Sequence, residues 1–232
     1  AQCSWFALVL VSLLSAQTAQ AAPFQESGGV VVIEAERFHN RVADPADPNH
    51  RWAIIPDEIK GSPANATGVR GGKYIQSLPE GGPNRNADPS VVGAAPYVDY
   101  LVNITTAGDY RLFLRWAGWD GASDSMYAQI VEVKTPEWYR YIGTAGNPVN
   151  FANVKNSTTG GAAVGWNGDG APSTDTANRL GGGGGEVKAV YSLKPGIYTI
   201  RLSRREDGSA VDSIILQLAS LPEPSNPGPA ES

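Results

Sequence analysis

Nine short segments of this chain alternate apolar and polar residues with a period of two. This alternation puts successive side chains on opposite faces of a β-strand, whereas an amphipathic helix repeats its apolar residues every three or four positions. Gly- and Pro-rich turn signals such as Lys194-Pro195-Gly196 separate the segments. Many short strands joined by such turns are typical of an antiparallel β-sandwich of the jelly-roll type, so we expect an all-β fold. The predicted strands are 30–36, 74–78, 97–104, 109–117, 126–133, 138–142, 187–193, 198–204 and 211–218.

The last two predicted strands flank a short polar turn built around Asp207-Gly208. An Asp-Gly turn between two alternating segments is a strong local signal for a β-hairpin. Asp212 lies inside the second of these strands, where a charge is costly unless a partner compensates it. The sequence therefore predicts a terminal hairpin that carries one acid in need of a partner.

Candidate partners for Asp212 lie at the other end of the chain, in the first long strand. Glu34 and Glu36 are two residues apart, so they share a face of that strand. Carboxylates on one face, joined by Asp212 from a neighbouring strand and by backbone carbonyls, suit Ca²⁺, which takes six to eight oxygen ligands. The alternative is a solvated outer face of an edge strand, on which three acids without an intervening cation repel one another. We expect a structural calcium on Glu34, Glu36 and Asp212.

Composition and charge narrow the possible partners. The formal net charge is −5, and no cluster of Lys and Arg supplies the basic stripe that a nucleic acid needs. No apolar run reaches the roughly 18 residues of a membrane-spanning helix, so we expect no membrane span. The 9 Tyr and 6 Trp favour strands and exposed aromatic platforms over helices.

The first 21 residues read as a secretory signal peptide, with an apolar stretch over 5–14 and a small-residue end at Ala19-Gln20-Ala21. Its basic n-region is missing, so we expect the native chain to start earlier. A cut before Ala22 removes Cys3, the only cysteine, and a protein without thiols is consistent with a secreted or cell-surface location. The expected domain is 22–220. The Pro-rich end, 221–232, reads as a linker or tail, with a fused catalytic or anchoring module as a possible continuation.

Two long insertions, at about 40–72 and 143–186, interrupt the strand pattern without a clear period. Loops of this length are usually functional or disordered. The chain carries no catalytic signature: it has only His39 and His50, it has no Gly-x-Ser-x-Gly elbow, and its glycine run 181–185 lacks the following Lys of a phosphate loop. We therefore do not expect an enzyme.

Three motifs occur in order along the chain: Val32-Ile33-Glu34-Ala35-Glu36, the segment AGDYRLFLRW at 107–116, and Val211-Asp212-Ser213-Ile214-Ile215-Leu216. Together they resemble carbohydrate-binding modules of families 6 and 35. The run 205–212 is also similar to the accessory C-terminal domain of glycoside hydrolase family 115. The resemblance covers about 29–218 and implies a galactose-binding-like jelly roll with calcium on Glu34, Glu36 and Asp212. The family 6 pattern is broken at Ala210, where those modules commonly carry a ligand-binding Asn.

Sugar recognition needs an aromatic face that stacks on the pyranose ring and a few polar groups that fix the hydroxyls. Segment 119–125, directly after a predicted strand, offers Trp119 together with Asp120 and Asp124. The alternative for both acids is capping of the turn or binding of a second cation. Further sugar-binding candidates lie near predicted loop ends or in the hairpin turn: Tyr74, Trp138, Trp166, Arg205 and Asp207. Core positions are predicted by the alternation of Tyr110, Leu112, Leu114 and Trp116 onto one face.

These expectations combine into a non-catalytic, secreted carbohydrate-binding domain with a structural calcium, which tethers a larger protein or a cell surface to polysaccharide. The first alternative is a structural or adhesive extracellular β-sandwich that contacts protein without binding sugar, and Ala210 and the large insertions favour it. The second alternative is a glycan-degrading enzyme on the same scaffold.

Overall fold

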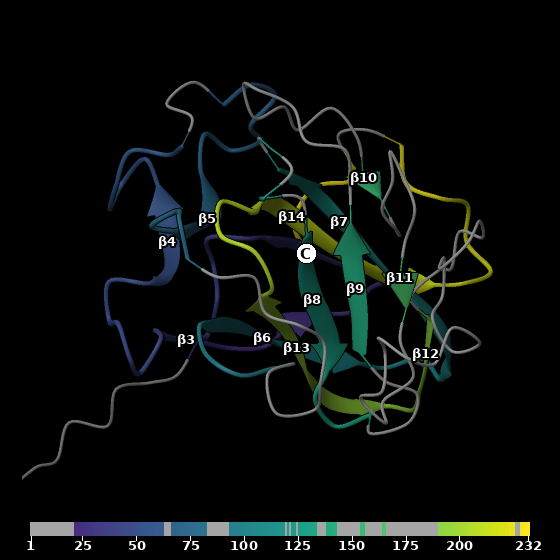
Figure 1. Cartoon of the computed structure of the whole chain (residues 1–232). Coiled ribbons are helices and arrows are strands. Elements are labelled where there is room, and N and C mark those ends of the chain that lie inside the picture. Colours follow the sequence, from purple (N-terminus) through teal and green to yellow (C-terminus); the bar gives the residue numbers. More distant parts are fainter. Residues whose placement is uncertain are drawn as a thin grey trace, which may run out of the picture.

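The chain folds into two seven-stranded β-sheets, as a computed structural model shows (Figure 1). The structure describes residues 21–62, 66–82, 93–118, 120, 122–123, 125–133, 138–142, 154–155, 164–165, 190–225 and 228–232. This described part of the chain contains no helix, and accordingly none with the length and apolar character to cross a bilayer. The fold is an all-β sandwich, which confirms the fold class that the period-two alternation predicts.

Sheet A has the strand order β1-β6-β13-β8-β9-β11, and β3 also pairs with β6. Its pairs are antiparallel except for β1 and β6, which run parallel. In the view of Figure 1, β8 and β9 of this sheet lie in front of the second sheet. The strands of sheet A are β1 (Phe24–Gln25), β3 (Asn40–Val42), β6 (Tyr97–Ile104), β8 (Ser125–Ile130), β9 (Trp138–Ile142), β11 (Val164–Gly165) and β13 (Gly196–Arg204).

Sheet B has the order β10-β7-β14-β5-β4, with β12 paired to β7 and β2 paired to β14. The pairing of β2 with β14 runs from Glu34 opposite Ser213 to Val30 opposite Gln217. The first long strand and the last strand of the chain are therefore neighbours, as predicted. The strands of sheet B are β2 (Val30–Glu34), β4 (Arg51–Ile55), β5 (Tyr74–Leu78), β7 (Gly108–Ala117), β10 (Val154–Lys155), β12 (Val190–Leu193) and β14 (Ala210–Leu218).

All nine predicted strands are present, and β5, β6 and β9 have the predicted bounds. The structure adds β1, β3, β4, β10 and β11, of which β3 and β4 lie in the first insertion. The sequence of β4 does not alternate because Trp52, Ala53 and Ile55 are all buried, so the strand is covered on both faces. A strand of this kind carries an apolar run instead of a period of two.

The main core lies between the sheets and consists of the inward-facing side chains of their strands. β7 contributes Tyr110, Leu112, Leu114 and Trp116, each at most 2% exposed, which confirms the face predicted from the sequence. β6 supplies every second residue from Val98 to Ile104. One continuous core therefore joins the two sheets.

The predicted terminal hairpin is wrong. β13 pairs with β6 and β8 in sheet A, whereas β14 pairs with β2, β5 and β7 in sheet B. The turn 205–209 therefore carries the chain from one sheet to the other. An Asp-Gly turn specifies a local reversal of the chain, but contacts between residues far apart in the sequence decide which strand pairs with which. Here β13 pairs with β6 from Gly196 to Ser203.

Candidate functional site

Four connections meet at one end of the sandwich, which we call the loop end and define by the described residues of 43–50, 79–82, 118–123 and 205–209. Ser209 Oγ lies 3.0 Å from the carbonyl oxygen of Ser123 and 2.8 Å from that of Ser125. Asp207 bonds to Gly82 and to His50, which belong to two other connections. The predicted site residues Asp120, Arg205 and Asp207 are thereby brought into one region.

Asp207 is the centre of a buried charged network at the loop end, and it is only 3% exposed. It accepts hydrogen bonds from the Gly82 amide, from Arg204 Nη2 at 3.0 Å and from His50 Nε2. Arg204 Nη1 lies 3.3 Å from His50 Nδ1. Because a guanidinium only donates, His50 Nδ1 accepts and Nε2 carries the proton that is shared with Asp207. The Asp207 carboxylate therefore joins its own connection to those of Gly82 and His50, and it is not exposed to a ligand.

Arg205, also predicted to bind sugar, is held against the start of β8. Its Nη1 donates to Ser125 Oγ at 2.5 Å and pairs with Glu206. The Ser125 hydroxyl in turn donates to Glu206 Oε2 at 2.5 Å, and Glu206 is 3% exposed. With 16% of its side chain exposed, Arg205 reaches the surface of the loop end while most of it supports the turn.

Asp120 is a predicted sugar-binding residue whose side chain is engaged within its own loop. Its Oδ1 accepts from the Ala122 amide at 2.8 Å and from Ser123 Oγ at 3.0 Å. This is an Asx turn, the capping alternative stated for this residue. Trp119, Asp124 and Trp166 lie outside the described residues. Of Trp138, only its place at the start of β9 is described.

Tyr74 lies in the interior and not at a surface where a sugar could stack. It begins β5, is 4% exposed and belongs to a small cluster with Ala53, Ile55 and Leu78. Burial raises the pKa of its hydroxyl to about 12. A Cβ added at Gly61 would lie 2.1 Å from that hydroxyl, which shows how closely the chain packs around it. This placement speaks against Tyr74 as a ligand-binding residue, because its ring has no free face.

Glu34, Glu36 and Asp212 gather where β2 pairs with β14. The Ala35 amide donates to the Asp212 carbonyl at 3.0 Å. Asp212 is the extra residue of a β-bulge, since the register between β14 and β7 shifts between Val211 and Ser213. Burial raises the pKa of all three carboxyls, and repulsion by neighbouring carboxylates adds to the rise at Glu34 and Glu36.

Two arginines already neutralise part of this acid cluster. Arg115 donates to Asp212 Oδ2, the Arg70 amide donates to Asp212 Oδ1 at 2.9 Å, and Arg70 Nε lies 2.8 Å from Glu34 Oε1. Glu34 Oε2 and Glu36 Oε2 are buried atoms without a hydrogen-bond partner among the described residues. Such oxygens are the donors that Ca²⁺ prefers.

The acid cluster thus offers a cation two oxygens, Glu34 Oε2 and Glu36 Oε2, and not the three carboxylates that the sequence predicts as ligands. Within the residues that the structure describes, no group of three or more His, Cys, Asp or Glu side chains is arranged to hold a metal ion. Asp212 is instead matched by Arg115, so its partner in this structure is a guanidinium.

The sequence provides unequal signals for the other residues of the loop end. Arg204 and Glu206 belong to a run of four charged residues of both signs between two apolar strands, so the sequence shows that ion pairs can form there but not that they are buried. His50 has no comparable signal, because 157 residues separate it from Asp207 and its own insertion shows no period.

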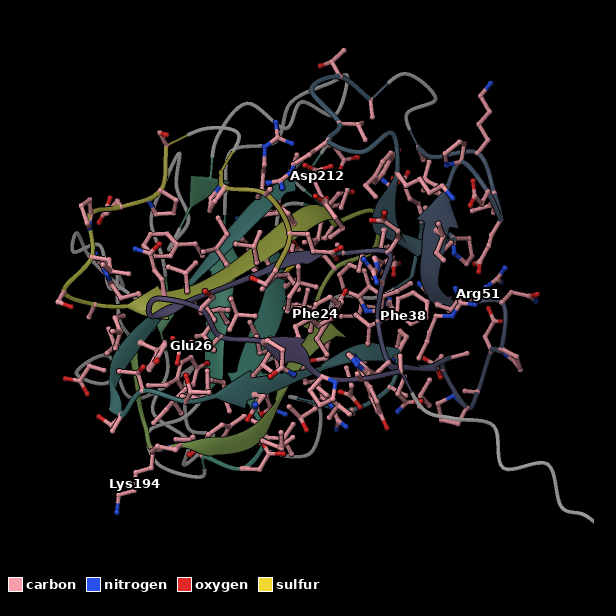
Figure 2. All side chains as sticks on the ribbon, turned by 180° about the vertical axis from the view of Figure 1, so that it is seen from behind. Phe24, Glu26, Phe38, Arg51, Lys194 and Asp212 are labelled. Atoms are coloured by element: carbon pink, nitrogen blue, oxygen red, sulfur yellow. The ribbon has the colours of Figure 1, made fainter. Side chains whose placement is uncertain are left out.

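A cavity of about 310 Å³ lies apart from these residues, between the N-terminal segment and the segment that follows β2. It is lined by residues 21–25, 37–39 and Ser232. Figure 2 labels two of its aromatic residues, Phe24 and Phe38. Phe24 and His39 meet edge to face with 5.4 Å between ring centroids. None of the predicted site residues lines this cavity.

No protein-family model and no curated protein sequence matches this chain. Among solved structures, it is similar to the GH26-CBM35 β-(1,4)-mannanase of Podospora anserina, with a TM-score of 0.43 and 16% identity over 85% of this chain and 29% of that one. A ruminal GH26 endo-β-1,4-mannanase gives 0.39 and 13% over 86% and 28%. A family 35 carbohydrate-binding module from Clostridium thermocellum gives 0.37 and 15% over 83% and 100%. The chain spans less than a third of either mannanase, and likenesses at these values assign neither family nor function.

Proposed function

We propose that this chain is a non-catalytic carbohydrate-binding domain that tethers a larger secreted protein, or a cell surface, to polysaccharide. The observation that supports it is the loop end, where the buried Asp207 network joins three connections and the Ser209 hydroxyl joins the fourth. A rigid scaffold lowers the ordering cost of binding a ligand. Trp119 directly precedes Asp120 in this region of the sequence. An aromatic ring beside an acid supplies the stacking surface and the hydroxyl partner that a sugar requires.

Binding to polysaccharide tests this proposal. Wild type, Trp119→Ala and Lys194→Ala are compared on a glycan array and by affinity electrophoresis. Lys194 is an exposed residue in the turn before β13, at the end of that strand remote from the loop end, so it is the matched control. We expect Trp119→Ala to weaken binding by about tenfold or more, as loss of a buried aromatic anchor does, and Lys194→Ala to bind like wild type. Failure of the wild type to bind any polysaccharide contradicts the proposal.

A second candidate is a structural or adhesive domain that contacts protein. It is favoured by Arg205 Nη1 and the Asp207 carboxylate, which are bonded within the protein, and by the fully buried Ala210. The glycan screen separates the two candidates, because only a carbohydrate-binding domain is retained. Release of reducing sugar from the same polysaccharides, assayed in parallel, identifies a glycan-degrading enzyme instead.

We also propose that Glu34 and Glu36 bind a structural calcium beside Asp212. The support is the pair of buried oxygens without a hydrogen-bond partner in the described structure, Glu34 Oε2 and Glu36 Oε2. A divalent cation there offsets the repulsion between these carboxylates, while Arg70 and Arg115 orient Glu34 and Asp212. The cation is thus proposed to hold the end of β2 against β14.

Thermal denaturation with and without EDTA tests the calcium proposal. A ligand present at 100 times its Kd stabilises the folded state by about 2.7 kcal/mol, which corresponds to roughly 5–10 °C in a domain of this size. We therefore expect chelation to lower the Tm of the wild type by about that amount. Glu36→Gln is expected to remove the response, because it takes away one of the two donors. An identical Tm in calcium and in EDTA overturns the site.

A further inference from the structure

The Pro-rich tail, residues 221–232, is described at 221–225 and 228–232, and these residues lie back against sheet B, as the yellow end of the chain shows in Figure 2. It begins over the outer face of the sheet, on side chains that point away from the core. Three contacts hold this start: Arg111 Nη2 to the Leu221 carbonyl at 2.9 Å, Arg111 Nη1 to Glu223 Oε1 at 2.9 Å, and Gln217 Nε2 to the Pro222 carbonyl at 2.7 Å.

The end of the tail lies along the edge of β2 that faces away from β14. The Ser232 amide donates to the Val32 carbonyl at 3.1 Å, and the Val32 amide donates to Ser232 Oγ at 2.8 Å. Two positions on, the Glu34 amide donates to Glu231 Oε1 at 3.2 Å, while Glu231 Oε2 pairs with Arg37. Val32 and Glu34 are the alternate residues whose backbone groups point to this edge. The tail satisfies these groups through the Ser232 amide, the Ser232 hydroxyl and the Glu231 carboxylate.

Between the two ends of the tail lies an apolar patch on the outer face of sheet B, formed by Val30, Val32, Phe113 and Ile215. Val32, Phe113 and Ile215 are 2%, 2% and 1% exposed, although they point away from the main core. The Arg111 guanidinium, which also holds the tail, lies 5.3 Å from the centre of the Phe113 ring. An apolar outer face beside an open strand edge is a combination that accepts another segment of chain.

We propose that the outer patch and the free edge of β2 form a peptide-binding surface, and that its occupant is the chain's own tail, acting as a releasable strap. This role goes beyond the proposed binding of carbohydrate and does not depend on it. The strap recognises the backbone groups of Val32 and Glu34 through the amide and hydroxyl of Ser232 and the carboxylate of Glu231. The same carboxylate pairs with Arg37 and so sets the register of the strap.

The composition of the tail suits reversible binding. A Pro-rich segment is already extended when free, so it loses little conformational freedom when it docks. Arg37 is 62% exposed at its side chain, and an exposed ion pair with Glu231 contributes specificity more than strength. The end of the strap is therefore held on β2 by one backbone hydrogen bond and two hydrogen bonds to its side chains, and it is open to competition from solvent or from another extended segment.

Hydrogen exchange of single backbone amides in the full chain, measured by NMR, tests the strap. The double variant Glu231→Ala/Ser232→Pro removes the carboxylate, the hydroxyl and the amide donor that contact β2. We expect exchange at the Val32 and Glu34 amides to accelerate by about tenfold or more, because water reaches them when the strap opens. The Ala35 amide, which bonds to the Asp212 carbonyl at 3.0 Å, is the internal control and stays protected if the fold is intact.

A synthetic peptide of residues 219–232, added in excess to the double variant, is expected to restore protection at Val32 and Glu34, while a scrambled peptide is not. Ser220→Ala, at an exposed residue directly before the tail, is the matched variant and is expected to behave as wild type. Unchanged exchange at Val32 and Glu34 in the double variant overturns the strap. Failure of the peptide to restore protection overturns the peptide-binding surface. A wild-type dimer in sedimentation that the double variant lacks assigns the surface to the tail of a second copy, which overturns the assignment to the chain's own tail.

Discussion

Glu26 shows how the surroundings of one carboxylate reverse the effect of burial. Burial alone raises the pKa of a carboxyl, but hydrogen bonds from Thr105, Gly29 and Thr106 outweigh it and lower the pKa of Glu26 to about 2. At Glu36, burial and the neighbouring carboxylates raise the pKa. Glu26 therefore stabilises the fold as an anion, whereas the surroundings of Glu36 favour a bound proton or a bound cation.

Replacement of Glu26 measures how much its carboxylate stabilises the fold. Since its pKa lies below the 4.5 of an ordinary glutamate, its contribution to stability is fully present above pH 4.5 and is lost as the pH falls from 4.5 toward 2. We expect Glu26→Gln to lower the free energy of unfolding by about 1.5–3 kcal/mol at pH 7, because hydrogen bonds to a charged group are lost. Urea denaturation at pH 7 and pH 3 measures the loss, which should shrink at the lower pH.

Glu132→Gln is the control for this experiment. Glu132 is exposed and also accepts hydrogen bonds from a backbone amide and a hydroxyl, both of Thr199 at 2.8 Å. Solvent competes with those bonds, so we expect a loss below about 1 kcal/mol. Equal losses in the two variants would show that burial does not strengthen the Glu26 site.

At the scale of elements, the β13–β14 connection is the part where local signals and structure disagree. The two strands belong to different sheets, and their turn is buried under Glu80 and Ser123. Gly208 lies at the centre of this corner with φ at 78°. A Cβ added there would lie 2.5 Å from both Glu80 Oε1 and Ser123 Oγ. The corner therefore requires glycine for its backbone and for the space around it.

Gly208→Ala tests whether the space around Gly208 is too small for a methyl group. A positive φ costs an alanine about 1–2 kcal/mol, and overpacking adds about 1–3 kcal/mol, so we expect a total loss near 2–5 kcal/mol. Gly72→Ala separates the two contributions, because Gly72 has φ at 83° but no atom within 4 Å of an added Cβ. It should lose only about 1–2 kcal/mol in the same denaturation experiment. Equal losses of stability in Gly208→Ala and Gly72→Ala would mean that the atoms around Gly208 move aside without an energetic cost.

At the scale of the whole molecule, the two sheets share one core, and the first and last long strands are paired. Leu112 is fully buried in that core, whereas Ile197 is 52% exposed. We expect Leu112→Ala to lower the free energy of unfolding by about 2–5 kcal/mol and Ile197→Ala to have little effect. Guanidinium denaturation followed by fluorescence and circular dichroism measures both, and a single shared transition is expected for one core. Separate transitions for the two probes would contradict a shared core.

Only part of the candidate site could be predicted from the sequence. The proximity of Glu34 and Asp212 follows from strand positions, because the terminal strands are neighbours. Glu36 lies in the turn after β2, so the alternation of a strand does not place it. The burial of Tyr74 and Asp207 does not follow, because it depends on distant partners such as Gly61, Gly82 and His50.

By itself, the sequence determined the nine predicted strands, the core face of β7 and the all-β class, because a period of two is a local property of the backbone. Only the tertiary structure decided that β13 and β14 separate into two sheets and that Asp207 is enclosed by His50 and Arg204. It also decided that the tail returns to the edge of β2. These outcomes depend on free energies of pairing and desolvation between residues far apart in the chain, for which no short segment carries a signal.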